Sequence, residues 1–328
     1  MPANLSPEYK AAEARLRQAV TPDEKLEALQ EMLATIPKHK GTEKMQADLK
    51  KRIARMKLEE EQQEKHGKRG GQFRVEKQGA GQAVLVGFPN VGKSSLVVAM
   101  TNAHLEVADY PFTTHLPGPG IMPFENLQLQ LVDTPPLTED IMEPWLPDLV
   151  RRADIALLVV DAGSDDALEQ VETVRKRFAA MHVHLTGRDP GDPDSPHLYR
   201  RTLLVANKSD AGGAEERLEI LREMYGGEFT ILAVSAKTGR GLEEFRRSVW
   251  EFLEKIRVYT KVPGKKAEKG QPYVLPRGST VLDLASSIHK DFVAGLKSAR
   301  IWGTSTRDGQ HVSRDHVLGE GDVVELHL

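Results

Sequence analysis

The chain reads Gly-Phe-Pro-Asn-Val-Gly-Lys-Ser from Gly87 to Ser94, between the apolar run Ala83–Val86 and the helix-forming segment Ser95–Met100. A strand, a glycine-bounded loop, Lys-Ser and a helix in this order are typical of a P-loop, which binds phosphate. Gly87 and Gly92 allow a tight turn whose backbone N–H groups converge on phosphate oxygens at the positive end of the helix. The predicted phosphate-binding residues are Gly87, Phe88, Pro89, Asn90, Val91, Gly92, Lys93, Ser94 and Ser95.

Three oxygen-bearing side chains near this loop are the predicted ligands of Mg²⁺. Ser94 opens the helix, and Asp133 ends the alternating segment Leu127–Asp133, which suits a carboxylate that holds the ion directly or through water. The third is a threonine in the loop from residue 109 to 120, where we favour Thr114 over Thr113. That loop has the position of a nucleotide-sensing switch, and its three prolines and two glycines predict no regular structure.

The base is predicted from Asn207-Lys208-Ser209-Asp210, which follows the buried-strand pattern Thr202–Ala206. A carboxylate at Asp210 accepts from both N1–H and the exocyclic amine of guanine, whereas adenine N1 would leave it unpaired. Asn207 is expected to fix the loop, the Lys208 stem to cover the base, and the Ala236 N–H to meet guanine O6. The predicted guanine-binding residues are Asn207, Lys208, Asp210, Ser235, Ala236 and Lys237, and the predicted ligands are GTP and GDP.

Composition limits the class of protein and its partners. The 328 residues carry a formal net charge of −3 and no cysteine, which excludes disulfides and thiolate metal sites and fits a reducing cytoplasm. Neither a signal peptide nor a run of membrane-spanning length is evident, so we expect a cytoplasmic protein without membrane or DNA partners. From Lys38 to Lys77 there are 13 Lys/Arg against 7 Asp/Glu. This local excess is either a solvated helix face or a contact for RNA phosphates.

The order of patterns predicts three regions. Residues 1–78 form a basic helical region, expected as a helical hairpin and a linker. Residues 79–256 alternate strands with helices, the last over Leu242–Ile256, and predict an α/β P-loop domain with a doubly wound, mostly parallel sheet. Residues 257–328 combine short strands with one helix, a pattern that suits a small β-grasp fold.

The ordered motifs resemble those of translation-factor-class GTPases, and within them the Obg group. The P-loop followed by Tyr110-Pro111-Phe112-Thr113-Thr114 is similar to that group's phosphate loop and first switch. Lys40–Lys44 and Leu49–Ala54 resemble the N-terminal helices of developmentally regulated GTP-binding proteins, and Arg257–Lys261 with Asp315–Leu318 resembles their TGS domain. The resemblance implies GTP hydrolysis and a TGS module that docks on RNA or ribosomal partners; an inert packing role for that domain stays open.

Two positions depart from the family pattern. Where that pattern has a glycine whose N–H reaches the γ-phosphate, this chain has Pro136, which has no N–H. Where Ras-type GTPases place a water-orienting glutamine, it has Leu137, which predicts slow intrinsic hydrolysis. Asn90 resembles the asparagine of GTPases that hold K⁺ near the phosphates, although a purely loop-stabilising role is equally open.

The predicted catalytic residues are Lys93, Asn90 and Thr114, with Mg²⁺ as cofactor and K⁺ as a candidate. Two functions compete. The first is a GTPase switch that acts on the ribosome or a translation factor. The second is a nucleotide-stabilised adaptor for RNA or protein with negligible turnover, which Pro136 and Leu137 keep open.

Overall fold

The structure is a computed structural model of the 328-residue chain. It describes Arg15, Leu29 and residues 31–36, 75–101, 117–188, 197–264 and 270–327. The chain divides into two compact units, Met1–Arg74 and Val75–Leu328. In the first unit Leu29, Met32 and Ile36 are buried at helical spacing. The rest of the predicted N-terminal helices and most of the basic excess lie outside the described residues.

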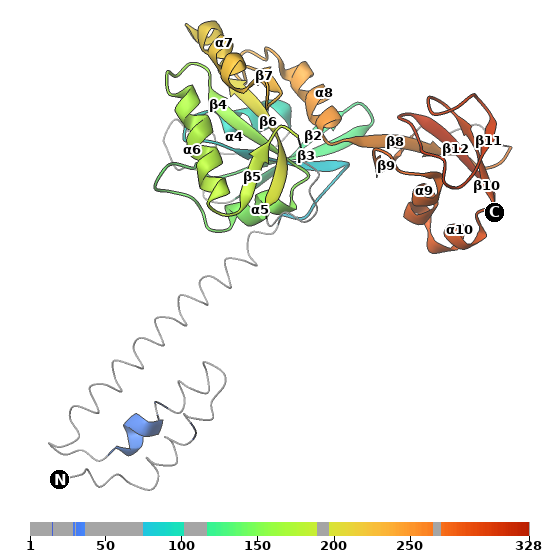
Figure 1. Ribbon diagram of the computed structural model, residues 1–328, viewed down its shortest axis with the longest axis horizontal. Helices are drawn as coiled ribbons and strands as arrows, with labels where there is room; N and C mark the ends of the chain where they lie inside the picture. Colours follow the sequence, from blue (N-terminus) through green and yellow to red (C-terminus); the bar gives the residue numbers. More distant parts are fainter. Residues whose placement is uncertain are drawn as a thin grey trace. The chain divides into compact units, whose positions relative to one another are not determined.

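The second unit begins with a seven-stranded sheet in the order β2-β3-β1-β4-β6-β5, with β7 also paired to β6 (Figure 1). Only β2 runs antiparallel to its neighbour, so the predicted doubly wound, mostly parallel α/β sheet is confirmed. The strands are β1 (Gly81–Val86), β2 (Gly118–Phe124), β3 (Leu127–Asp133), β4 (Ile155–Asp161), β5 (Val183–Thr186), β6 (Leu198–Asn207) and β7 (Ile231–Ala233). The helices are α4 (Lys93–Met100), α5 (Leu146–Arg152), α6 (Ala167–Ala179), α7 (Ala214–Tyr225) and α8 (Leu242–Phe252).

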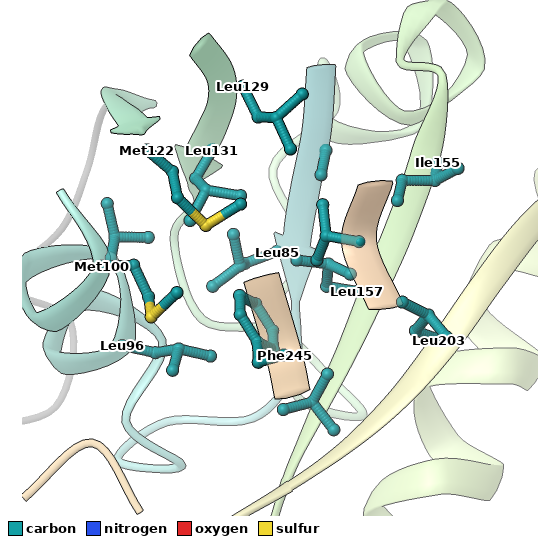
Figure 2. Packing of buried hydrophobic residues seen from close by; sticks show 14 of the residues in the cluster. Leu85, Leu96, Met100, Met122, Leu129, Leu131, Ile155, Leu157, Leu203 and Phe245 are labelled. Atoms are coloured by element: carbon teal, nitrogen blue, oxygen red, sulfur yellow. The ribbon is translucent and has the colours of Figure 1, made fainter. Parts of the chain in front are cut away.

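The core of this domain lies between the sheet and the helices α4 and α8. Met100 of α4 and Phe245 of α8 pack against Leu85, Leu131 and neighbouring side chains of the sheet (Figure 2). All six residues of β1 are buried, so the side chains on the other face of the sheet are covered as well. Helices therefore cover both faces, and the carboxyl ends of the parallel strands are left to carry the functional loops.

Two sequence predictions about the elements of this domain are wrong. The stretch from residue 109 to 120 was expected to lack regular structure, yet β2 begins at Gly118 and includes Pro119 and Pro123. Prolines are tolerated there because β2 is an edge strand and the two residues share one phase, so their missing N–H groups face away from β3. The predicted last helix ends at Phe252 instead of Ile256, because β8 already begins at Lys255.

The C-terminal residues form a separate five-stranded sheet in the order β11-β10-β12-β8-β9. Two helices cover one face and bury Val258, Leu284, Ile301 and Val324, where the sequence indicated a single helix. The elements are β8 (Lys255–Thr260), β9 (Tyr273–Pro276), α9 (Val281–Ile288), α10 (Lys290–Gly295), β10 (Ser298–Trp302), β11 (Gln310–Val312) and β12 (Asp322–His327). Among the helices that the structure describes, none has the length and apolar character that a membrane span requires.

Candidate nucleotide-binding site

The loop between β1 and α4 follows a tight path that its glycines make possible. The φ angles are 157° at Gly87 and 88° at Gly92. A Cβ atom at Gly87 would lie 2.3 Å from the carbonyl oxygen of Val159, and one at Gly92 would lie 2.2 Å from Nδ2 of Asn207. Both positions therefore exclude a side chain, through backbone conformation and through close neighbours.

Lys93 lies inside this loop. Its Nζ donates to the carbonyl oxygens of Gly87 at 3.0 Å and Phe88 at 2.9 Å. Burial lowers the pKa of Lys93 to about 8, although the nearby charge of Asp133 opposes the shift. Two carbonyl dipoles do not fully compensate a buried ammonium, so the arrangement favours an anionic ligand such as a phosphate group.

The two described candidates for magnesium ligation lie together. The Ser94 hydroxyl donates to Oδ2 of Asp133 at 2.5 Å, at the point where α4 begins and β3 ends. Burial raises the pKa of Asp133 against the opposing effects of Ser94, Lys93 and the Thr134 N–H. A hydroxyl and a carboxylate are the hard oxygen donors that Mg²⁺ takes together with phosphate oxygens and water, so these residues fit the ion.

The third predicted magnesium ligand lies outside the described residues, as does the first-switch segment around it. This applies to Thr114 and to the alternative Thr113. Within the ranges that the structure describes, no group of three or more His, Cys, Asp or Glu side chains could hold a metal ion. Among the described residues, Ser94 and Asp133 are therefore the side chains that could contribute to a magnesium ion at this loop.

Asn207 joins the phosphate loop to the predicted guanine loops. Its Nδ2 donates to the carbonyl oxygen of Val91 at 2.9 Å, and its Oδ1 accepts from the Ala236 N–H at 3.1 Å. The side chain is buried, so both halves of the amide are satisfied by protein. The Ala236 N–H is therefore occupied in this structure. To meet a guanine O6 it must be shared with, or released from, Asn207.

Asp210 is exposed at the same edge of the sheet, where a base could reach its carboxylate. A hydrogen bond from the Ser235 hydroxyl is the main cause that lowers the pKa of Asp210, with Lys237 and Lys208 contributing. The group is therefore ionised at neutral pH, as acceptance from two guanine donors requires. Ser235 is itself buried and accepts from the Thr238 N–H at 3.0 Å, which fixes its position.

Lys208 is held by a residue to which the sequence gave no role. Its Nζ lies 2.5 Å from Oδ2 of Asp161, the last residue of β4. The backbone N–H of Asp161 is in turn bonded to Oε1 of Gln170 at 3.0 Å. The position of Asp161 at the carboxyl end of a central strand was the signal in the sequence, because parallel strands deliver their following loops to one edge.

Asn90 is exposed at the top of the phosphate loop and has a φ of 58°. This left-handed conformation is one that asparagine adopts more easily than most residues, which accords with a role in the turn. Exposure also leaves its amide accessible to an ion. Both readings of Asn90 therefore stand.

The segment after Asp133 is fixed against the phosphate loop. The Thr134 hydroxyl donates to the Leu85 carbonyl at 2.5 Å, and the Leu137 N–H donates to the Gly87 carbonyl at 3.1 Å. The Leu137 side chain is fully buried, so it does not face an attacking water. From Thr134 to Thr138 each backbone N–H is already bonded, except at the two prolines, which have none.

Comparison with known proteins extends this picture along the chain. Residues 82–187 match the family model described as 50S ribosome-binding GTPase, and residues 256–328 match the TGS domain. An uncharacterized GTP-binding protein of Methanocaldococcus jannaschii is 30% identical, over 93% of this chain and 92% of its own length. The developmentally regulated G-protein 2 of Arabidopsis thaliana is 26% identical, over 92% of this chain and 90% of its own length.

A phosphate loop and a guanine-recognition motif at one edge of the sheet are typical of P-loop GTP-binding proteins. The matches place the chain in that class. The similarity also covers the C-terminal sheet. The chain belongs to the family of developmentally regulated GTP-binding proteins, which occurs in archaea and eukaryotes and carries a TGS domain. This narrower name replaces the broader Obg designation. GTPases of this class hydrolyse GTP and generally use Mg²⁺.

The role of Asp210 is testable by changing the base that it recognises. Asp210→Asn replaces one acceptor by a donor, which suits the C2 carbonyl of xanthine and opposes the amine of guanine. Because two hydrogen bonds to a charged group are altered, GTP affinity should fall about 100-fold while XTP affinity rises. Competition titrations with both nucleotides measure this. Unchanged GTP affinity in the folded variant would remove Asp210 from the base site.

The missing N–H at Pro136 gives a second prediction. Pro136→Ala supplies a donor at the position where the family pattern uses glycine, so the ratio of the GDP Kd to the Kd of a non-hydrolysable GTP analogue should rise about tenfold. Pro135→Ala is the matched control, since it removes a proline from the same segment but adds no donor at position 136. Calorimetric titration compares the two variants. Equal ratios in both would show that the γ-phosphate does not use this donor.

Proposed function

We propose that the protein is a GTP-hydrolysing switch that docks on the ribosome or on a translation factor in one nucleotide state. The observation that carries the proposal is the Asn207 bridge, through which the phosphate loop and the guanine loops form one site. The ribosomal part is supported by the description of the matched GTPase model, which names binding to the 50S ribosome. GTP and GDP are the ligands whose exchange and hydrolysis would drive the switch.

In this proposal the three regions divide the work. Residues 79–256 bind and hydrolyse the nucleotide, and the TGS domain, residues 257–328, contacts ribosomal RNA or protein. Residues 1–78 add a basic contact, supported by the excess of Lys and Arg between Lys38 and Lys77. A cationic segment in a chain whose net charge is −3 gives phosphate-rich partners a local point of attraction.

The catalytic part of the proposal uses few groups. Lys93 would bind the β- and γ-phosphates, and Ser94, Asp133 and Thr114 would hold Mg²⁺, which would neutralise charge that develops on the phosphates. Asn90 would hold K⁺, which would supply positive charge in place of an arginine finger. Because Leu137 is buried and apolar, it does not orient water, and the intrinsic rate is slow.

A second candidate is an adaptor that GTP or GDP stabilises without significant turnover. One observation favours it. The backbone N–H groups from Thr134 to Thr138 are bonded within the protein or missing at the prolines, so the segment offers no free backbone donor to a γ-phosphate. Without such a donor GTP and GDP would be bound alike, and the nucleotide would act as a structural ligand.

Co-sedimentation with ribosomal subunits separates the two candidates. The full chain is incubated with subunits in the presence of GTP analogue, GDP or no nucleotide, and multiple-turnover phosphate release is followed with and without subunits. The switch predicts binding in one nucleotide state and faster turnover on the ribosome. Binding that ignores the nucleotide, together with negligible turnover, would establish the adaptor instead.

The proposed role of K⁺ has its own test. Hydrolysis should be at least about tenfold faster in K⁺ than in Na⁺, a small part of the stimulation that an arginine finger supplies. Asn90→Gly removes the amide but keeps the left-handed conformation, so it should abolish this difference and preserve nucleotide affinity. Equal wild-type rates in the two salts would exclude K⁺ from the mechanism.

A further inference from the structure

The β2–β3 hairpin extends from the phosphate site to the TGS domain. Its register is continuous over seven pairs, from Gly118 opposite Asp133 to Phe124 opposite Leu127. At the open end Asp133 accepts the hydrogen bond from Ser94, and Gly118 follows closely on the segment that contains the predicted switch threonine. One end of the hairpin thus belongs to the nucleotide site.

The other end is a two-residue turn that contacts β8 of the TGS domain. Asn126 donates from Nδ2 to the Tyr259 hydroxyl at 2.8 Å, and Glu125 forms an ion pair with Arg257. Arg257 also pairs with Glu320 of the TGS domain. A single guanidinium therefore bridges a carboxylate of each domain.

The hairpin packs against the main core and against the helix of the phosphate loop. Met122, Leu129 and Leu131 are buried in the main core. A Cβ added to Gly120 would lie 2.7 Å from the Thr101 hydroxyl and 3.0 Å from Val97, so β2 lies directly on the end of α4, the helix of the phosphate loop. Packed elements of this kind shift between discrete arrangements instead of deforming gradually.

The contact at the tip is suited to respond to such a shift. It consists of the Asn126–Tyr259 hydrogen bond, the Glu125–Arg257 ion pair and a hydrogen bond of 3.4 Å from the Arg257 guanidinium to Oδ1 of Asn126. Such polar contacts depend on distance and angle more sharply than apolar packing does. Tyr259 is buried, and the Arg257 guanidinium lies 5.6 Å from the ring centroid of Trp250 on α8. Displacement of the exposed turn would therefore change its hydrogen bonding to the more buried Arg257 and Tyr259 side chains.

We propose that the β2–β3 hairpin couples the nucleotide at the phosphate loop to the position of the TGS domain, through the contact of Glu125 and Asn126 with Arg257 and Tyr259. This inference rests on the proposed GTP switch and names its internal transmission. Coupling between two sites is reciprocal. Loss of the tip contact must therefore change the relative affinity for GTP and GDP by the same factor by which the nucleotide changes the contact.

The test uses the full chain, and the absence of native cysteine allows two labels to be attached cleanly. Glu219→Cys on α7 and Ser313→Cys after β11 introduce exposed sites in the two domains for energy-transfer measurements. The distance between the labels is compared in GDP and in a non-hydrolysable GTP analogue. The tip variant combines Glu125→Gln with Asn126→Ala, and Glu223→Gln on the exposed side of α7 is the control.

We expect the distance to depend on the nucleotide in the labelled wild type and in the control, and to lose that dependence in the tip variant. The ratio of GDP to GTP-analogue Kd, measured without labels, should change about fivefold or more in the tip variant only. A nucleotide-dependent distance that survives in the tip variant, or that is absent from the wild type, would overturn the coupling. The proposed switch itself fails separately, if ribosomal subunits bind equally in both nucleotide states.

Discussion

The amide of Asn207 is the interaction on which the nucleotide site depends. It bonds Val91 of the phosphate loop and Ala236 of the loop after β7, and it lies where a side chain at position 92 would stand. A buried amide is costly unless both of its halves are bonded, so Asn207 holds together the phosphate loop, the loop after β6 and the loop after β7 through protein contacts alone. Glycine is therefore required at position 92 for two reasons. It adopts the backbone conformation of the loop, and it leaves the space that the Asn207 side chain occupies.

This preorganisation leaves charged groups whose burial is only partly compensated. Lys93 is bonded to carbonyl oxygens, and burial lowers its pKa, while burial raises the pKa of Asp133. Both shifts disfavour the charged forms that the proposed ligands require. Phosphate and a divalent cation bring the opposite charges, so binding would stabilise the charged forms, and the site is expected to select a charged ligand.

The sequence predicted the parts of the site that depend on local pattern. Asp133 and Asn207 each end a segment with a strand pattern, and parallel strands bring their ends together. Asp161 ends such a segment as well, but no role was predicted for it. Edge elements were less predictable. β2 contains two prolines, β5 and β11 are short, and their places depend on partners far along the chain. The hydrogen bond from the Leu137 N–H to the Gly87 carbonyl likewise could not be predicted from the sequence, because every residue except proline has a backbone N–H.

The segment from Thr134 to Thr138 limits how a nucleotide signal could leave the site. The residues after Asp133 are anchored to β1 and to the phosphate loop, and two of them have no backbone donor. A movement of this segment would first have to break the hydrogen bonds of Thr134 or Leu137. The hairpin also begins near the nucleotide site at Gly118, the first residue of β2. This strand lies at the edge of the sheet and packs on α4. An edge strand has one fewer neighbour to resist displacement than a central strand. Within the described residues, movement of the nucleotide loops is therefore transmitted more easily along β2 than through the anchored segment, and β2 ends at the turn that meets Arg257 and Tyr259.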